Sequence, residues 1–208
     1  MGQKANINGL HLSKNKDWNS VWYLDKTDYS GLLMDDYKIY KYYFYNQSHN
    51  KNLLKIRIYR FTRNLLIFLV FSHELKKSLK DLKQIELKPK DLNIKNLFVI
   101  SHRASVTESL SEVTYLAQKV AYLIEKRVSF RSYTIKTILE KVYSLPNVKG
   151  VGILCSGRLN DVDMAKTDSL SKGSIPFQSL NINLNYGFAT ANTTKGLIGI
   201  KVWIYYKK

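Results

Sequence analysis

The sequence is poor in residues that crosslink a chain or interrupt its regular structure. Its 208 residues include one cysteine, which excludes an internal disulfide framework and a metal site built from several cysteines. Prolines number three and glycines ten, and no glycine occurs between Gly31 and Gly150. Cys155 ends the apolar run that begins at Val151, so we expect a small buried side chain there rather than a reactive thiol.

Long apolar runs are also missing. The longest uninterrupted one, Leu65–Phe71, is far short of the roughly 20 residues that a helix needs to cross a bilayer. No long basic amphipathic helix stands alone either, so we expect no membrane partner. The hydrophobic fraction of 45% is nevertheless ample for a packed core.

Acidic residues are scarce relative to basic ones. The chain has 33 lysines and arginines against 16 acidic residues, for a net charge of +17. A protein with this excess repels itself unless a polyanion neutralises it, and nucleic acid is the first candidate.

The residues of common catalytic sites do not gather in the sequence. The four histidines lie far apart without metal-ligand spacing, and there is no phosphate loop or dinucleotide fingerprint. Two tripeptides, Glu74–Lys76 and Glu86–Lys88, match the acidic-x-lysine end of a nuclease motif, and Asp35–Asp36 could supply another acid. Such tripeptides arise by chance in a lysine-rich chain. We therefore predict no enzymatic activity, no cofactor, no metal and no small-molecule substrate.

The first half of the chain shows the order helix, strand, strand, helix, strand. We expect an irregular basic arm over residues 1–29, and then a domain over residues 30–104. The patterns predict a helix at Tyr29–Tyr45, strands at Leu53–Tyr59 and Leu65–Phe71, a helix at Glu74–Ile85 and a strand at Leu97–Ile100.

The second half, residues 105–208, reads as helices packed on a sheet. Ser105 and Glu108 form a predicted capping box, and apolar residues then repeat at helical spacing to about Lys126. Further elements are expected as a helix at Ser129–Ser144 with Tyr133, Ile138, Val142 and Tyr143 inward, a strand at Lys149–Cys155, a short helix near Asp161–Ser171 and a terminal hairpin. In that hairpin, Leu180–Tyr186 and Gly196–Tyr205 alternate apolar and polar residues, with Ile198, Ile200, Val202 and Ile204 on one face. The predicted fold class is α+β, with an antiparallel or mixed sheet in this second domain.

Motifs at both ends of the chain resemble one known family. The C-terminal motifs are Ser156–Leu159, Ile175–Phe177, Leu180–Gly187 and Gly196–Ile204, and the N-terminal ones are Met1–Lys4, Asn8–Leu10 and Trp18–Tyr23. Together they resemble the S-three family, the universal third protein of the small ribosomal subunit. The resemblance implies an N-terminal arm, a type II K-homology-like domain and a C-terminal two-layer α/β domain that binds RNA.

The family's K-homology domain has a Gly-x-x-Gly loop, which should stand here at about Ser72–Glu74. No glycine is present there. Such a loop works because backbone without side chains can lie against nucleotides. We therefore expect a shortened, degenerate domain that keeps its fold and loses this clamp on single-stranded RNA.

Ten basic residues are candidates for RNA contact. Arg158 follows Gly157 after a predicted strand, so its guanidinium could form two hydrogen bonds with one phosphate. The full set is Lys4, Lys126, Arg127, Arg131, Lys136, Arg158, Lys166, Lys172, Lys195 and Lys201. Lys126, Arg127, Arg131 and Lys136 span a predicted helix–helix junction, while Lys166 and Lys172 occupy positions at which the family usually has arginine.

The resemblance also implies where this helix–helix junction lies in the ribosomal subunit. In the family the matching stretch lines the channel through which mRNA enters, and three basic residues there act in opening messenger duplexes. Arg131 matches one of the three, whereas the other two positions hold Ser132 and Ile135. Strong duplex opening is therefore not expected of this chain.

The amino-acid composition bears on the cellular compartment in which the protein is made. Lysine carries most of the basic charge and tyrosine is abundant at 15 residues, while glycine and proline are scarce, as AT-rich codons would produce. Residues 1–8 show no import presequence pattern, so we expect a protein made inside an organelle and acting in the mitochondrial matrix. A plastid or an AT-rich bacterial cytoplasm is the alternative.

The leading hypothesis is a structural component of the small ribosomal subunit, located in its head near the mRNA channel. Expected partners are small-subunit ribosomal RNA, mRNA and neighbouring head proteins. The alternative is a free-standing RNA-binding or RNA-chaperone protein that acts off the ribosome.

Overall fold

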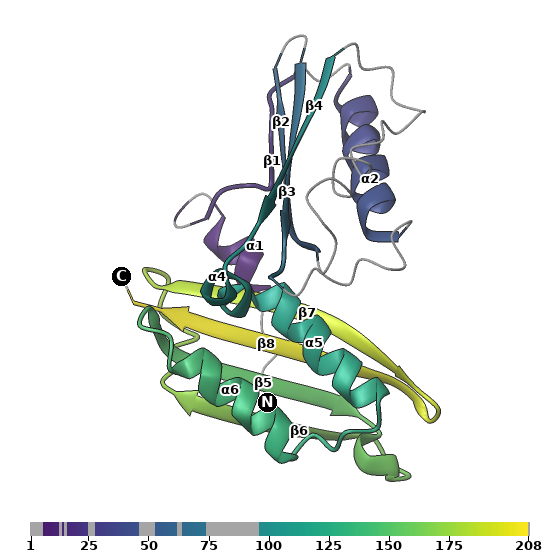
Figure 1. Ribbon diagram of the computed structural model, residues 1–208, viewed down its shortest axis with the longest axis vertical. Coiled ribbons are helices and arrows are strands. Elements are labelled where there is room, and N and C mark those ends of the chain that lie inside the picture. Colours follow the sequence, from purple (N-terminus) through teal and green to yellow (C-terminus); the bar gives the residue numbers. More distant parts are fainter. Residues whose placement is uncertain are drawn as a thin grey trace. The chain divides into compact units, whose positions relative to one another are not determined.

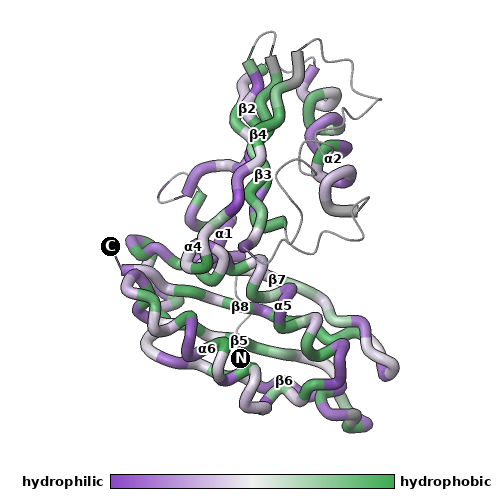
Figure 2. Tube along the Cα trace, viewed as in Figure 1, coloured by the Kyte–Doolittle hydropathy of each residue, from purple (hydrophilic) through white to green (hydrophobic). Residues whose placement is uncertain are grey.

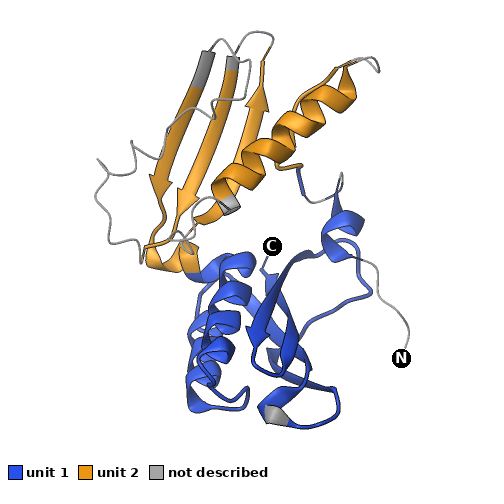
Figure 3. Ribbon diagram, turned by 90° about the vertical axis from the view of Figure 1, so that its right-hand side faces the viewer, with its two compact units in different colours: residues 1–17, 110–208 blue, residues 18–109 orange. Residues whose placement is uncertain are grey.

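The computed structural model describes residues 6–12, 14, 16–24, 28–45, 53–61, 64–73 and 96–207. The chain divides into two compact units, coloured separately in Figure 3. Unit 1 comprises residues 1–17 and 110–208, and unit 2 comprises residues 18–109. The predicted basic arm is thus divided between the units, because its first 17 residues group with the C-terminal half of the chain.

Unit 2 is a mixed four-stranded sheet with one long helix. The strands follow the order β1-β2-β3-β4; β2 and β3 are antiparallel, while the pairs β1–β2 and β3–β4 are parallel. They span β1 Ser20–Val21, β2 Leu53–Arg60, β3 Asn64–Phe71 and β4 Asn96–Arg103, and the helix is α2 Tyr29–Tyr45. Helix α2 packs on one face of the sheet (Figure 1), where Ile39 and Tyr43 join the buried side chains of β2 and β3.

The predicted elements of unit 2 are confirmed where they are described. Helix α2 has the predicted bounds, and the strands differ by a few residues at their ends. The run Leu65–Phe71 is apolar at every position. Alternate side chains enter the core, and the side chains between them stay part-exposed on the other face of the sheet. Along α2 hydrophilic and hydrophobic residues mix, as expected of a helix with one buried face (Figure 2). The predicted helix Glu74–Ile85 lies outside the described residues.

Unit 1 is a two-layer α/β arrangement with an antiparallel sheet. The order is β6-β5-β8-β7, and every neighbouring pair is antiparallel. Two helices cover one face of this sheet (Figure 1), and their apolar residues form a core with β5 and β8. The elements are α1 Ile7–His11, α4 Val106–Ser111 (which crosses the unit boundary), α5 Val113–Glu125, α6 Tyr133–Tyr143, β5 Val148–Gly157, the 3-10 turn η1 Leu159–Asp161, β6 Lys166–Gly173, β7 Asn183–Thr193 and β8 Gly196–Tyr206.

The prediction of a short helix near Asp161–Ser171 was wrong. The chain there forms η1 and then β6, which pairs along its whole length with β5. Serine and threonine are frequent in this stretch, and their intrinsic preference for a helix is weak. Pairing with β5 at the edge of the sheet therefore decides its structure.

The capping box is confirmed, but the helix that it begins is shorter than predicted. The backbone N–H of Glu108 donates to the Ser105 hydroxyl, and the Ser105 N–H donates to the Glu108 carboxylate. Extended backbone at Glu112 then separates α4 from α5. The Tyr206 hydroxyl donates to the Ser111 carbonyl, which satisfies a group that the interrupted helix leaves free.

Two of the side chains expected to point inward from the second helix do not. Tyr133 is 82% exposed, and Tyr143 is 37% exposed at the edge of the core. The buried stripe consists of Ile135, Leu139 and Val142, whose spacing of four and three residues keeps them on one face. Tyr133 is the first residue of α6 and precedes that stripe.

The terminal hairpin is confirmed in β8 and shifted in β7. Ile198, Ile200, Val202 and Ile204 are all buried, as their alternation predicted. Strand β7 begins at Asn183 rather than Leu180 and pairs with β8 as far as Thr193–Gly196, so that only Thr194 and Lys195 form the loop.

The prediction for Cys155 is confirmed. Its side chain is completely buried, and burial raises the pKa of the thiol to about 12.

Candidate nucleic-acid interface

The connection from β5 to β6, the β7–β8 loop and the end of α5 lie together at one end of the unit 1 sheet. Gly157 of β5 lies opposite Lys166 of β6, and Ser156 lies opposite Gly199 of β8, so the start of β6 and the β7–β8 loop share this end. The Asn192 N–H donates to the Glu125 carboxylate at 3.2 Å, which brings the last turn of α5 to the same place (Figure 1). We call this region the hairpin end. Six of the ten predicted contacts lie there or beside it: Lys126, Arg127, Arg131, Arg158, Lys166 and Lys195.

The end of α5 presents two adjacent cations. The Arg127 N–H donates to Ile124 and the Val128 N–H donates to Leu123, which is the hydrogen-bond pattern of a Schellman cap. That cap requires a left-handed residue, and Arg127 takes it with φ 61°. Both side chains are exposed, and the Lys126 ammonium lies 5.2 Å from the centre of the Tyr122 ring. The turn therefore exposes two cations at the negative end of the helix dipole.

Arg131 is already bound within the protein. Its Nε and Nη2 donate to the two carboxylate oxygens of Asp168 at 2.8 and 3.0 Å. The hydrogen bonds from Arg131 are the main cause that lowers the pKa of Asp168, and the same contact raises the pKa of Arg131. The pair joins the segment before α6 to β6, so Arg131 also has a structural role.

Arg158 is likewise part of its own turn. Gly157 before it has φ 145°, and an added Cβ would lie 3.1 Å from Leu197 and Ile198 atoms, so the turn favours glycine. The Arg158 Nε donates to the Val162 carbonyl at 3.0 Å, and its Nη2 pairs with Asp163 at 3.2 Å. The Asp163 side chain is fully exposed, so water competes for this pair and a phosphate could replace the carboxylate.

Lys166 and Lys195 are exposed at the hairpin end, and no described side chain forms an ion pair with either. Lys166 points to the helix-covered face of β6 beside Asp168, whose pKa it helps to lower. Lys195 is one of the two loop residues of the hairpin. Together with the end of α5 they leave four cations available to a polyanion.

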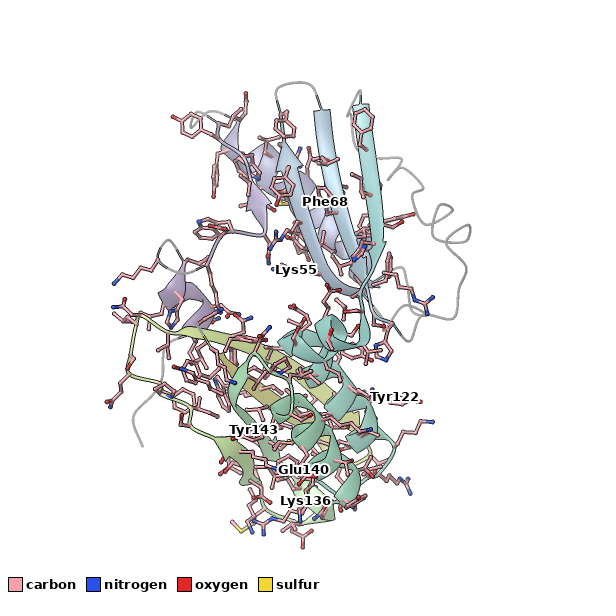
Figure 4. The ribbon with its side chains drawn as sticks, turned by 60° about the vertical axis from the view of Figure 1, so that its left-hand side comes forward. Lys55, Phe68, Tyr122, Lys136, Glu140 and Tyr143 are labelled. Carbon is pink, nitrogen blue, oxygen red and sulfur yellow. The ribbon has the colours of Figure 1, made fainter. Side chains whose placement is uncertain are left out.

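The remaining predicted contacts lie elsewhere. Lys172 is near the other end of β6, six residues from Lys166, which is about 20 Å along a strand. It lies 3.5 Å from Glu140 and 5.4 Å from the Tyr143 ring centre. Lys136 is exposed on α6, one turn before Glu140 (Figure 4). Most of the length of β6 therefore separates Lys172 from the hairpin end.

Two predicted residues need separate mention. Lys201 lies in the middle of β8 on the face that α5 and α6 do not cover, opposite Leu154 and Phe188. Lys4 lies outside the described residues.

The sequence analysis did not identify the acidic residues at the hairpin end. Glu125, Asp163 and Asp168 each bind a group at the hairpin end, and they reduce its net positive charge. No local sequence pattern could have identified Asp168, because its partner is 37 residues away and the strand that carries it was predicted as a helix.

The described part of the chain offers little for catalysis. No group of three histidine, cysteine, aspartate or glutamate side chains comes together there as metal ligands. Asp36, considered as a nuclease acid, is 4% exposed and binds Trp22 and Arg60. No helix of the described chain is long and apolar enough to cross a membrane.

These features define a class: a basic α+β protein whose exposed cations gather at turns of a packed two-layer unit, as in proteins that bind nucleic acid through its phosphates. Residues 120–204 match the family described as ribosomal protein S3, C-terminal domain. The chain is 35% identical to the small ribosomal subunit protein uS3 of Clostridium novyi, over 99% of this chain and 92% of that protein. It is 35% identical to the uS3 protein of Alkaliphilus oremlandii, over 99% and 86%, and 32% identical to that of Clostridium tetani, over 99% and 92%.

The chain therefore belongs to the uS3 family of small ribosomal subunit proteins. This family is one of structural ribosomal proteins rather than enzymes, as the sequence predicted. The fold agrees with it, since a K-homology-like domain is followed by the C-terminal α/β domain.

Proposed function

We propose that this protein is a structural constituent of the small ribosomal subunit and that it binds small-subunit ribosomal RNA through the hairpin end of unit 1. The observation that carries the proposal is similarity over 99% of the chain to proteins named small ribosomal subunit protein uS3. The net charge of +17 and the exposed cations at the hairpin end support the RNA-binding part.

The mechanism is electrostatic docking onto a rigid support. Lys126, Arg127, Lys166 and Lys195 neutralise phosphates directly and release counterions. Arg158 joins them by exchanging its exposed partner Asp163 for a phosphate, because a guanidinium binds both with the same geometry. The packed core beneath them holds the turns in place, so little ordering entropy opposes binding.

The finer location is also part of the proposal. Basic residues at the α5–α6 junction suit a place in the subunit head near the channel by which mRNA enters, with head proteins as neighbours. The two family positions filled by Ser132 and Ile135 support contact with mRNA without strong duplex opening. The lysine-rich and tyrosine-rich composition supports a mitochondrial ribosome, and the bacterial relatives suit a bacterial cytoplasm equally well.

The test is cosedimentation. A native lysate is separated on a sucrose gradient in magnesium, and the chain is followed by an antibody across the fractions. We expect it to migrate with the small subunit and to remain there in moderate salt. Migration near the top of the gradient would overturn the ribosomal proposal in favour of a free RNA-binding protein. The same gradient run on purified organelles and on the remaining cytoplasm would test the compartment.

A further inference from the structure

The sheet of unit 2 has a second face that α2 does not cover. Side chains alternate across a strand, so the residues of β2 and β3 between those that enter the core point to this other face. The strand registers arrange nine such positions in three rows: Tyr59, Leu66 and Phe98; Arg57, Phe68 and Ile100; Lys55, Val70 and His102.

This open face carries aromatic rings on three neighbouring strands. Tyr59 and Phe68 meet edge to face with their ring centres 5.8 Å apart. Phe98 follows on β4 and is 55% exposed, and Ile100 beside it is 44% exposed. No described residue of unit 2 buries these two side chains. The rings therefore form an aromatic surface that takes no part in the core of unit 2.

The charge on this face has one sign. Lys55 and Arg57 lie along β2, and none of the nine positions is acidic. Figure 4 shows Lys55 and Phe68 on neighbouring strands of this sheet. Arg57 lies directly opposite Phe68 in the register, so a group that stacks on the ring can place a phosphate at the guanidinium.

We propose that this open face binds a single-stranded segment of RNA, with bases stacked on Phe68 and Phe98 and with phosphates at Lys55 and Arg57. Accessible rings bordered by cations, here the exposed Phe98 and the part-exposed Phe68, form the kind of surface that single strands use, because every base has a face that stacks on an aromatic ring. Lysine is depleted at the core of protein interfaces, so Lys55 on this face favours a nucleic acid as the partner. The site deepens the RNA-binding part of the proposed function, and it differs from the hairpin end in unit and in chemistry.

The test uses the purified full-length chain and a short unstructured RNA that carries 4-thiouridine. Ultraviolet crosslinking followed by mass spectrometry of the peptides should place crosslinks in β2, β3 or β4. Fluorescence anisotropy then compares Phe68→Leu/Phe98→Leu with wild type. Leucine keeps the surface apolar and removes the stacking rings, so we expect binding to weaken by roughly tenfold or more while its salt dependence stays unchanged. Arg57→Gln should instead make the salt dependence shallower.

A matched control is Tyr37→Leu, which removes an exposed ring from α2 on the other side of the same unit and should leave binding unchanged. Circular dichroism checks that each variant is folded. Crosslinks confined to residues 110–208, together with unchanged affinity of the double variant, would overturn this site and leave the hairpin end intact. Loss of subunit assembly with unchanged RNA affinity would identify the face as a protein interface and overturn the proposal as well. A wild-type chain that binds no RNA would overturn both sites.

Discussion

Arg158 binds its own turn through the Val162 carbonyl and the Asp163 carboxylate, and both partners are near the surface. An exposed ion pair of this kind contributes little to stability, at most about 1 kcal/mol. The same guanidinium gains more from a phosphate, where two charge-assisted hydrogen bonds can form. We therefore expect Arg158 to matter more for binding than for folding.

We predict that Arg158→Gln weakens binding to small-subunit ribosomal RNA by roughly tenfold, with a loss of unfolding free energy of about 1 kcal/mol or less. Filter binding and urea denaturation measure the two effects. The matched variant Asp163→Asn removes the competing carboxylate and should leave binding equal or tighter. Weaker binding in Asp163→Asn would show that the turn, rather than the guanidinium, makes the contact.

Asp36, in contrast, is expected to matter for folding, because it is buried and paired in unit 2. Its carboxylate accepts hydrogen bonds from the Trp22 indole at 2.8 Å and from the Arg60 Nε at 2.9 Å. The side chains of Asp36 and Arg60 are 6% and 10% exposed. Removing the acid would leave a buried guanidinium without compensation.

Accordingly, Asp36→Ala should lower the unfolding free energy of unit 2 by about 3–5 kcal/mol. Urea denaturation followed by tryptophan fluorescence measures this, since Trp22 contacts the site. The neighbouring Asp35→Ala is the control: Asp35 forms only a 3.7 Å helix-surface pair with Lys38, so a change under about 0.5 kcal/mol is expected. Equal effects of the two substitutions would contradict the structural role of Asp36.

Among the elements, β6 is held at the edge of the sheet partly by the Arg131–Asp168 pair, and this attachment depends on pH. The pKa of Asp168 is lowered in the folded state, mainly by the hydrogen bonds from Arg131. A carboxyl group of lowered pKa stabilises the fold above its unfolded pKa of about 3.9. That contribution disappears as the pH falls through the lowered folded value.

The difference in stability between wild type and Asp168→Asn should therefore be constant at neutral pH and vanish on acidification below about pH 4. Urea denaturation at a series of pH values measures it. Arg131→Gln should reproduce the loss, because it removes the same pair. A difference that persisted in strong acid would mean that Asp168 acts through its shape rather than its charge.

At the scale of the whole molecule, a net charge of +17 opposes the compact state through self-repulsion and attracts a polyanion. The structure concentrates part of this charge at the hairpin end, where four cations have no ion-pair partner among the described residues. Both proposed sites rely on phosphate contacts, so we expect ionic strength to control affinity.

We predict that the logarithm of the affinity for unstructured RNA falls linearly with the logarithm of salt concentration. Five phosphate contacts at the hairpin end give a slope of about −3.5, and contacts on the open sheet of unit 2 would make it steeper. Anisotropy titrations over a range of potassium chloride concentrations measure this slope. A flat response would contradict electrostatic docking.

Local pattern predicted much of the fold. The bounds of α2, the two strands β2 and β3 and the buried face of β8 follow from helical or alternating periodicity, which depends only on neighbouring residues. The capping box at Ser105 is equally local. Strand β6 was predicted as a helix because its structure depends on pairing with β5, a contact that no window of the sequence contains.

For the candidate site, too, some features follow from the sequence and others only from the tertiary structure. The sequence by itself determined the family, the excess of positive charge and the absence of a Gly-x-x-Gly loop, since these are properties of composition and motif. Only the tertiary structure decided which lysines and arginines share a surface and which are neutralised by Asp163 or Asp168. It also decided that aromatic and basic residues of three strands lie on one open face. The physical reason is that strand register and turns bring together charges and rings that lie far apart along the chain.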